Sequence, residues 1–174
     1  WKGLDGKKTF EKVTDNAPLR EGKSYMYEGG VRIPMLVMGP GVQHGAVNED
    51  TAVHLLDLCP TFMAMGGMTP DESLDLDGCN ILPILKGEAS AAHATDGAER
   101  DSLFWHHPAD NKSFSVIRRG PWKLMKNTGP VRTEAPDLQL FKITNDPGEQ
   151  ENLVEKYPEI TQQLVADLDD WMEQ

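Results

Sequence analysis

The feature that most limits the fold is a series of four short apolar runs in the second half of the chain. Turn-forming residues separate these runs, among them Gly120-Pro121 and Gly129-Pro130. Short apolar runs at such close spacing are typical of antiparallel strands joined by tight turns. We therefore predict an antiparallel sheet built from four strands, at residues 103–105, 114–118, 122–125 and 138–143.

An amphipathic helix pattern follows the fourth run. Pro158 suits the first turn of a helix, where its missing N–H leaves no hydrogen bond unmade. The apolar residues after it share one stripe, at Ile160, Leu164, Leu168, Trp171 and Met172. The opposite side is acidic and is predicted to face solvent. The pattern predicts a four-stranded sheet that is covered on one face by a C-terminal helix.

A glycine-containing segment at residues 18–34 leads into a run of apolar residues. The adjacent Gly29 and Gly30 allow the backbone to approach a neighbour or a ligand closely. The apolar run 31–38, which ends before Gly39, predicts a buried strand. Further on, Pro60 predicts a helix that ends at Gly66-Gly67. One face of that helix is predicted to be buried, with Cys59, Phe62, Met63 and Met65 as core residues.

Composition excludes some partners. The 174 residues suffice for a domain with a core of its own. The net charge of −11 argues against nucleic acid, because phosphates require clusters of lysine and arginine. It also means that an anionic substrate has to be bound by local cations. Two cysteines are too few for a disulfide framework. No apolar run approaches the ~20 residues of a membrane span, so we expect neither a nucleic-acid nor a membrane partner.

Several short motifs, in order from about residue 16 to the end, resemble the sulfatase family of the alkaline-phosphatase-like superfamily. The first is G-K-x-x-x-Y-E-G-G-V-R-x-P at residues 22–34, followed by D-L-x-P-T at 57–61. The others are L-D-G at 76–78, L-P-x-L-x-G at 82–87, F-W-H at 104–106, R-x-G-x-W-K-L at 118–124, L-[YF]-x-[LI]-x-x-D-P at 140–147 and E-x-x-N-L at 149–153.

The resemblance implies an α/β fold with two parts. Residues 1–90 are expected to be the C-terminal end of the catalytic α/β domain, which is incomplete here. Residues 91–174 are expected to be the α+β C-terminal subdomain, an antiparallel sheet packed against a helix. The resemblance also suggests a periplasmic or secreted protein.

The resemblance assigns sulfate binding and charge stabilisation to Lys23. A fixed ammonium group near the sulfate lowers the barrier because it is already in place when charge develops. The residues alone leave open a solvated Lys23 that pairs with Glu21 or Glu28. His106 and, behind it, His107 are candidates for contact with the leaving group or with sugar hydroxyls. The residues leave equally open that His106 packs between a strand and a loop. Arg20 either lines the site or holds the loop.

Other polar residues are predicted to be structural. Tyr27, Glu28 and Arg32 are expected to support the segment, with the two charged groups satisfying each other or the loop backbone. Arg118 and Lys123 are expected to form ion pairs on the surface of the sheet.

The resemblance also shows what these residues lack. Sulfatases use a formylglycine nucleophile and a calcium ion, and no position here matches the nucleophile motif or the metal ligands. Neither Cys59 nor Cys79 lies in the required context. We therefore expect a C-terminal part that needs the missing N-terminal part of the same protein, calcium and formylglycine, and that is inactive alone. Its expected substrate is a sulfated small molecule or glycan.

Two alternatives remain from the sequence. A phosphodiesterase or phosphonate hydrolase of the same superfamily would share these motifs. Residues 100–174 could instead form a non-catalytic carbohydrate-binding module. The nucleophile context separates the first alternative from a sulfatase, and glycan titration tests the second.

Overall fold

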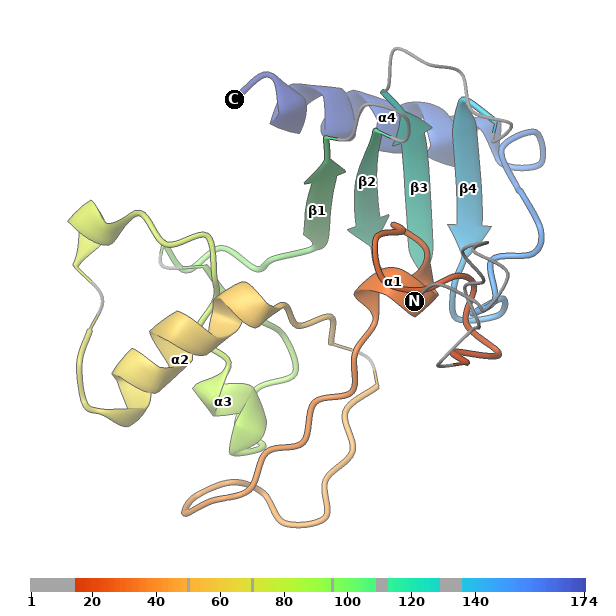
Figure 1. The fold of residues 1–174 in the computed structure, drawn as a ribbon. Helices are drawn as coiled ribbons and strands as arrows, with labels where there is room; N and C mark the ends of the chain where they lie inside the picture. Colours follow the sequence, from red (N-terminus) through yellow and green to blue (C-terminus); the bar gives the residue numbers. More distant parts are fainter. Residues whose placement is uncertain (1–14, 50, 70, 95, 109–112, 129–135) are drawn as a thin grey trace, which may run out of the picture.

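The computed structural model describes residues 15–174 except for 50, 70, 95, 109–112 and 129–135. Two parts lie side by side (Figure 1). We call residues 33–100 the helical unit and residues 102–174 the sheet unit. Residues 16–32 form a third element, the lysine loop, which packs against the sheet unit.

The sheet unit contains four strands in the order β1-β2-β3-β4, and every neighbouring pair is antiparallel. The strands are β1 (Ser102–His107), β2 (Phe114–Arg119), β3 (Trp122–Asn127) and β4 (Leu138–Lys142). Gly120 takes a φ of 52° in the tight turn between β2 and β3, a conformation that favours glycine. This arrangement confirms the predicted meander.

Helix α4 (Pro158–Met172) covers one face of the sheet, as predicted. Leu164 and Leu168 pack on Ile117, Leu124 and Leu140, and all five side chains are buried. At the end of the helix, Trp171 stacks on Phe104 with ring centroids 5.0 Å apart. The apolar stripe of the helix therefore forms one half of the core of the sheet unit.

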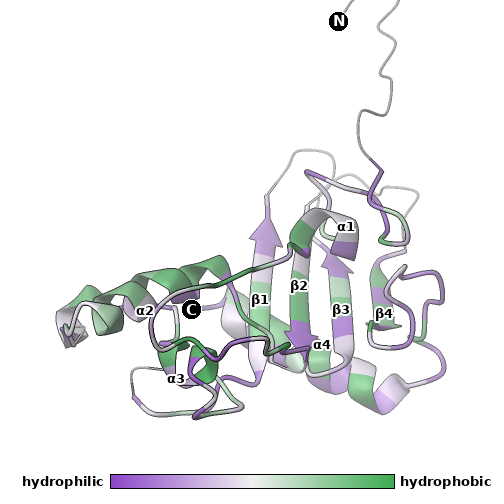
Figure 2. Ribbon diagram, turned by 90° about the horizontal axis from the view of Figure 1, so that it is seen from below, coloured by the Kyte–Doolittle hydropathy of each residue, from purple (hydrophilic) through white to green (hydrophobic). Residues whose placement is uncertain are grey.

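The lysine loop covers the opposite face of the sheet, which the sequence did not predict. It contains the short helix α1 (Glu28–Val31), which lies over β2 and β3 in the view from below (Figure 2). Tyr27 is buried against this face, and its hydroxyl donates to Gln139 Oε1 at 2.9 Å. Tyr27 belongs to a second buried core on this face, together with Phe114, Val116, Met125, Phe141 and Ile143.

The helical unit is organised by a buried carboxylate. Its elements are η1 (Leu55–Asp57), α2 (Leu58–Met65), η2 (Glu72–Leu74) and α3 (Leu82–Leu85). Arg100 binds the buried Asp57 through two contacts, of 2.5 and 2.7 Å. The backbone N–H groups of His54 and Cys79 donate to the same carboxylate. This network joins segments that are far apart in the sequence. The buried apolar cluster of the same unit is small and consists of Cys79, Ile81 and Ala92.

The predicted buried strand at residues 31–38 is wrong. Beyond Val31, which ends α1, this segment is extended but belongs to no strand, and Leu36 and Met38 are 98% and 97% exposed. A strand is buried only when neighbouring strands pair with it and side chains cover it. The described residues provide neither for this segment.

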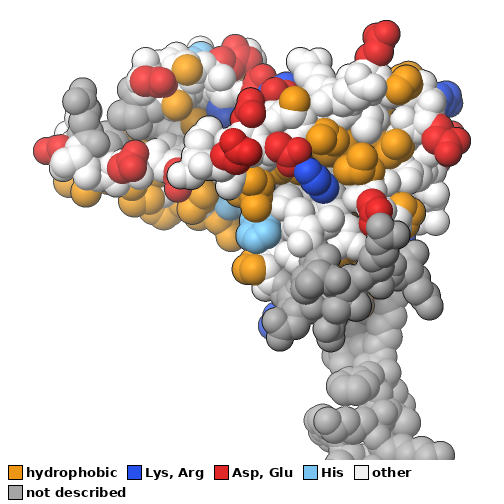
Figure 3. Space-filling view, turned by 90° about the horizontal axis from the view of Figure 1, so that it is seen from above, with side chains coloured by type: hydrophobic (Ala, Val, Ile, Leu, Met, Phe, Trp, Pro, Cys, Tyr) orange, Lys and Arg blue, Asp and Glu red, His pale blue; other side chains and the backbone are white. Residues whose placement is uncertain are grey.

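The predicted buried face of α2 is also wrong, although its end at Gly66 agrees with the prediction. Phe62 is 60% exposed, Met65 is 46% exposed and Cys59 is exposed. Met63 is half-buried, so the described residues cover this face only in part. Apolar side chains consequently gather along one edge of the helical unit (Figure 3).

Candidate functional site

The lysine loop is closed at its base by backbone contacts. The N–H of Gly29 donates to the carbonyl of Arg20 at 2.9 Å. The side-chain amide of Asn16 donates to the carbonyls of Glu21 and Gly29, both at 3.2 Å. Lys23 lies in the turn between these closing contacts. The loop thus presents a lysine at its tip and fixes both of its ends.

The glycine pair permits this closure. A Cβ atom on Gly29 would overlap the carbonyl oxygen of Arg20, and one on Gly30 would overlap that of Tyr25. Both obstacles are backbone atoms, so no side-chain rotation could relieve the overlap. Only glycine allows the two sides of the loop to come this close. The expectation of close backbone approach at these two residues is confirmed.

Lys23 itself is exposed. Within the described part of the chain it forms no ion pair, and Glu28, one of its two expected alternatives, instead binds Lys123. The adjacent residue Ser24 has a φ of 77°, in the left-handed region. The ammonium group of Lys23 is therefore available to an anion outside the loop.

Arg20 holds the loop. Its Nη1 donates to the carbonyl oxygen of Glu149 at 2.9 Å, and its guanidinium carbon lies 3.9 Å from the centroid of the Tyr27 ring. A guanidinium over an aromatic face is stabilised electrostatically. Of the two roles considered for Arg20, these contacts favour the support of the loop.

The two candidate histidines lie on opposite faces of the sheet. His106 Nδ1 is 3.0 Å from Ser115 Oγ, and that hydroxyl also contacts the sulfur of Met172 on α4. His106 is thus on the helix face, while side-chain alternation places His107 on the face of the lysine loop. The structure separates His106 from the lysine loop, and substrate contact by either histidine stays a prediction.

Sequence reasoning missed a buried charge cluster, which we call the Lys123 cluster and which consists of Lys123, Glu28 and Glu149. Lys123 has a fully buried side chain, so its predicted place on the sheet surface is wrong. Its Nζ is 2.9 Å from Glu28 Oε1, to which it donates a hydrogen bond. The same nitrogen is 2.9 Å from Glu149 Oε1 in an ion pair without hydrogen-bond alignment.

Burial shifts the pKa values of two charged groups in this region. Burial raises the pKa of Glu149, and the nearby Lys123 ammonium acts in the opposite direction. Burial lowers the pKa of Arg118, whose Nε is buried without a hydrogen-bond partner among the described residues. The motifs around residues 28, 123 and 149 mark these positions in the sequence, but only the register of the sheet brings them together.

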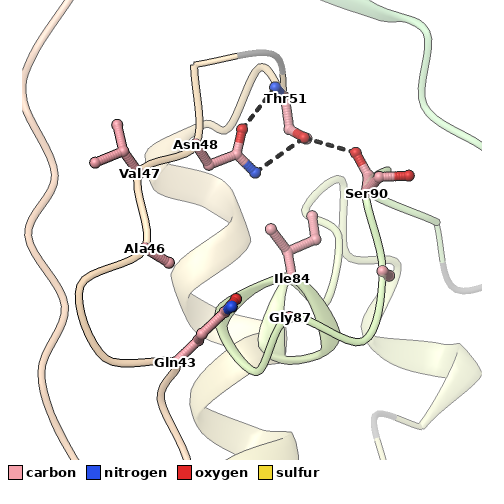
Figure 4. Close-up of a pocket in the computed structure, with 9 residues that line it drawn as sticks. Gln43, Ala46, Val47, Asn48, Thr51, Ile84, Gly87 and Ser90 are labelled. Atoms are coloured by element: carbon pink, nitrogen blue, oxygen red, sulfur yellow. Dashed lines mark hydrogen bonds between the residues drawn. The ribbon is translucent and has the colours of Figure 1, made fainter.

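The described residues around the candidate site include no group of metal ligands. Among the described residues, no three His, Cys, Asp or Glu side chains form a group that could hold a metal ion. A pocket of about 300 Å³ lies in the helical unit, between residues 43–51 and 84–90 (Figure 4). None of the predicted site residues lines it. No helix in the described ranges has the length and apolarity to cross a membrane.

The structure thus presents a lysine on a closed loop, beside an antiparallel sheet with one C-terminal helix, the arrangement that the resemblance to sulfatases implies. Comparison with known families specifies it further. Residues 21–174 match the family model described as N-sulphoglucosamine sulphohydrolase, C-terminal, and the chain belongs to this family of sulfatases.

Individual relatives agree. A sulfatase of Formosa agariphila is 32% identical over 161 residues, which cover 86% of this chain and 27% of that protein. Arylsulfatase K of Rattus norvegicus is 31% identical over 156 residues, covering 84% of this chain and 25% of its own length. The chain thus spans about a quarter of the length of these relatives.

A solved structure shares the fold. The crystal structure of Ps i-CgsB in complex with k-i-k-neocarrahexaose superposes with a TM-score of 0.73 at 30% sequence identity. The match covers 90% of this chain and 32% of that one. The predicted combination of a four-stranded antiparallel sheet with helices, in a sulfatase-like arrangement, is therefore confirmed.

Proposed function

We propose that this chain is the C-terminal part of an enzyme that hydrolyses sulfate esters, and that Lys23 binds the sulfate group. The observation that carries this proposal is the exposed ammonium group at the tip of the closed loop. It lies within the motif that the chain shares with sulfatases. The net charge of −11 makes such a local cation necessary for an anionic substrate.

Lys23 would act on charge that develops during S–O cleavage. The non-bridging oxygens of a sulfate ester are negative throughout, and the bridging oxygen gains charge as its bond to sulfur breaks. An ammonium group fixed beside them stabilises the transition state without reorganising. The closing hydrogen bonds of the loop supply that fixation, because they restrain the backbone on both sides of Lys23.

The nucleophile and the metal are proposed to lie outside this chain. The family resemblance assigns nucleophilic attack to formylglycine and electrostatic activation to calcium. The described residues offer no metal-binding group, and the chain spans about a quarter of its relatives. We accordingly assign both groups to an N-terminal part of the same protein.

The exposed apolar edge of the helical unit supports this assignment. Ile33, Leu36 and Met38 are exposed along a backbone that belongs to no strand. An extended segment with unpaired N–H and C=O groups is suited to pair with another strand. We propose that the N-terminal part pairs with this segment and covers the exposed face of α2.

A sulfated carbohydrate is the proposed substrate class. The neighbour Ps i-CgsB was crystallised with an oligosaccharide, k-i-k-neocarrahexaose, and is 30% identical to this chain. Relatives described as arylsulfatases keep a small aryl ester as the other possibility. Periplasmic or secreted localisation remains a proposal that rests on the family resemblance.

The test compares variants in the longer protein that carries this chain. Lys23→Ala should lower kcat/KM for an aryl sulfate and for a sulfated oligosaccharide by about 10²–10³-fold, the range for loss of one charge-stabilising group. Lys156→Ala is the matched control, because that side chain is 61% exposed in the sheet unit. Unchanged activity of the Lys23 variant would refute the role of Lys23.

Two further measurements test the assignment of the reaction. The 174-residue chain alone should show no turnover, and turnover above a Lys23→Ala control would contradict the proposed need for an N-terminal part. Faster hydrolysis of an aryl phosphate diester than of the aryl sulfate would favour the phosphodiesterase alternative.

A further inference from the structure

The Lys123 cluster connects the sheet unit to the lysine loop at a position with no access to solvent. The side chains of Lys123 and Glu149 are fully buried, and that of Glu28 is 4% exposed. Lysine and glutamate are rarely buried unless they are paired, because desolvation of an isolated charge is very unfavourable. The charge of each glutamate therefore depends on Lys123, and the charge of Lys123 depends on the two glutamates.

The contacts of Glu149 reach both sides of the loop. Its Oε2 accepts from the backbone N–H of Glu28 at 2.6 Å, five residues after Lys23. Its carbonyl oxygen accepts from Arg20, three residues before Lys23. Glu149 itself has a φ of 52°, in the left-handed region, which sharpens the turn after Asp146. One residue of the sheet unit thus fixes both ends of the segment that carries Lys23.

The register of the sheet explains why Lys123 reaches the loop. Lys123 lies opposite Phe141 on β4 and opposite Arg118 on β2. Its side chain shares a face with Met125 and Phe141, the face that Tyr27 covers. The ammonium group therefore meets Glu28 at the first turn of α1. Any shift of β3 by one residue would turn this side chain to the helix face.

We propose that Lys123 and Glu149 are positioning residues for Lys23, so that the sheet unit determines where the Lys23 ammonium group is held. This inference rests on the proposed function of Lys23, and neither residue touches the substrate in it. Their effect is to keep the loop in one conformation. Misplacement of a reacting or charge-stabilising group by about 1 Å can lower the rate by about 10²-fold.

A double-mutant cycle in the longer protein tests the proposal. Lys123→Met and Glu149→Gln should each lower kcat/KM by about 10–100-fold, mainly through kcat. The same changes in a Lys23→Ala background should cause little further loss, because they act through Lys23. Glu149→Gln keeps the shape of the side chain and serves if Lys123→Met does not fold. Glu151→Gln is the matched control, since Glu151 is 69% exposed.

Limited proteolysis of the 174-residue chain gives a readout that is independent of catalysis. A lysine-specific protease should cleave after Lys23 several-fold faster in the Glu149→Gln variant. Cleavage after Lys86, which is exposed in the helical unit, should not change. Equal acceleration at both sites would indicate general unfolding and would overturn the positioning role.

The outcomes separate the two proposals. If Lys23→Ala lowers activity but the losses from Lys123→Met or Glu149→Gln are fully additive with it, the positioning role is refuted and the role of Lys23 stands. If Lys23→Ala has no effect, the role of Lys23 is refuted, and with it the inference that these residues position a functional group.

Discussion

The two units of this chain differ in how completely they bury their apolar residues. In the sheet unit, Ile117, Leu124 and Leu140 are 0% exposed, and both faces of the sheet are covered. In the helical unit, the buried apolar cluster consists of Cys79, Ile81 and Ala92. All but one of the exposed large hydrophobic residues in the described ranges lie before residue 75.

The difference indicates which unit is self-sufficient. An exposed apolar patch of this kind marks an interface rather than a finished surface. The sheet unit completes its core with α4 and the lysine loop, whereas the helical unit combines a small apolar cluster with the ion pair of Asp57 and Arg100. The helical unit is therefore expected to be the less stable of the two in isolation.

The largest effect is expected from removal of the buried carboxylate of the helical unit. Asp57→Ala leaves Arg100, 14% exposed, without its ion-pair partner and frees the N–H groups of Cys79, which is buried, and of His54, which is partly buried. Loss of one partner of a buried pair costs about 3–5 kcal/mol. Amide hydrogen exchange should accelerate in residues 52–100 and much less in residues 114–142. Asp77→Ala, at an exposed position, is the control; equal acceleration in both units would contradict this separation.

Acidification should change the stability of the two units in opposite directions. Burial acts to raise the pKa of Asp57, but hydrogen bonds from Arg100 and from two backbone N–H groups outweigh it and hold this pKa below its ordinary value. Burial lowers the pKa of His54. Groups with lowered pKa contribute stability above their unfolded pKa values, about 3.9 for Asp and 6.5 for His, and lose it as pH falls through the folded values.

In the sheet unit, the contribution of Glu149 to stability depends on pH in the opposite direction. Because its folded pKa is raised, its contribution is present below the unfolded value and is lost as pH rises through the folded one. Lowering the pH from 7 towards 4 should thus cost the helical unit protection first through His54, and Asp57 should add to the loss only below about 3.9. Hydrogen exchange at several pH values measures this, and a parallel loss in both units would show that they unfold together.

The smallest effect on stability is expected in the exposed segment around Leu36 and Met38. Replacement of Leu36 and Met38 by serine should change the free energy of unfolding by less than about 0.5 kcal/mol, as for exposed positions in general. It should nevertheless reduce self-association of the isolated chain, which sedimentation velocity measures. A large loss of stability would show that this segment packs against the rest of the chain.

Local patterns predicted the sheet unit well. The spacing of apolar residues and turn residues located β1 to β4 and α4, because both alternation and the helical stripe are local properties of the sequence. The same reasoning failed at residues 31–38 and at Phe62 and Cys59. An apolar run indicates that a segment has to be covered, but not that the covering residues belong to the same 174-residue chain.

The candidate site likewise has features that the sequence predicted and features that it did not. The sequence predicted a turn that carries Lys23 and close backbone approach at Gly29 and Gly30, because both features depend on neighbouring residues; the role of Lys23 in sulfate binding stays a prediction. The sequence misassigned Lys123 to the surface, because the partners of that side chain are 95 residues before it and 26 residues after it.

By itself, the sequence determined the order of the strands, the stripe of the C-terminal helix and the loop that presents Lys23. Only the tertiary structure decided which charges are buried together and which apolar residues remain uncovered. The physical reason is that burial and ion pairing depend on the solvent removed by distant segments, whereas turns and periodicity depend on adjacent residues alone.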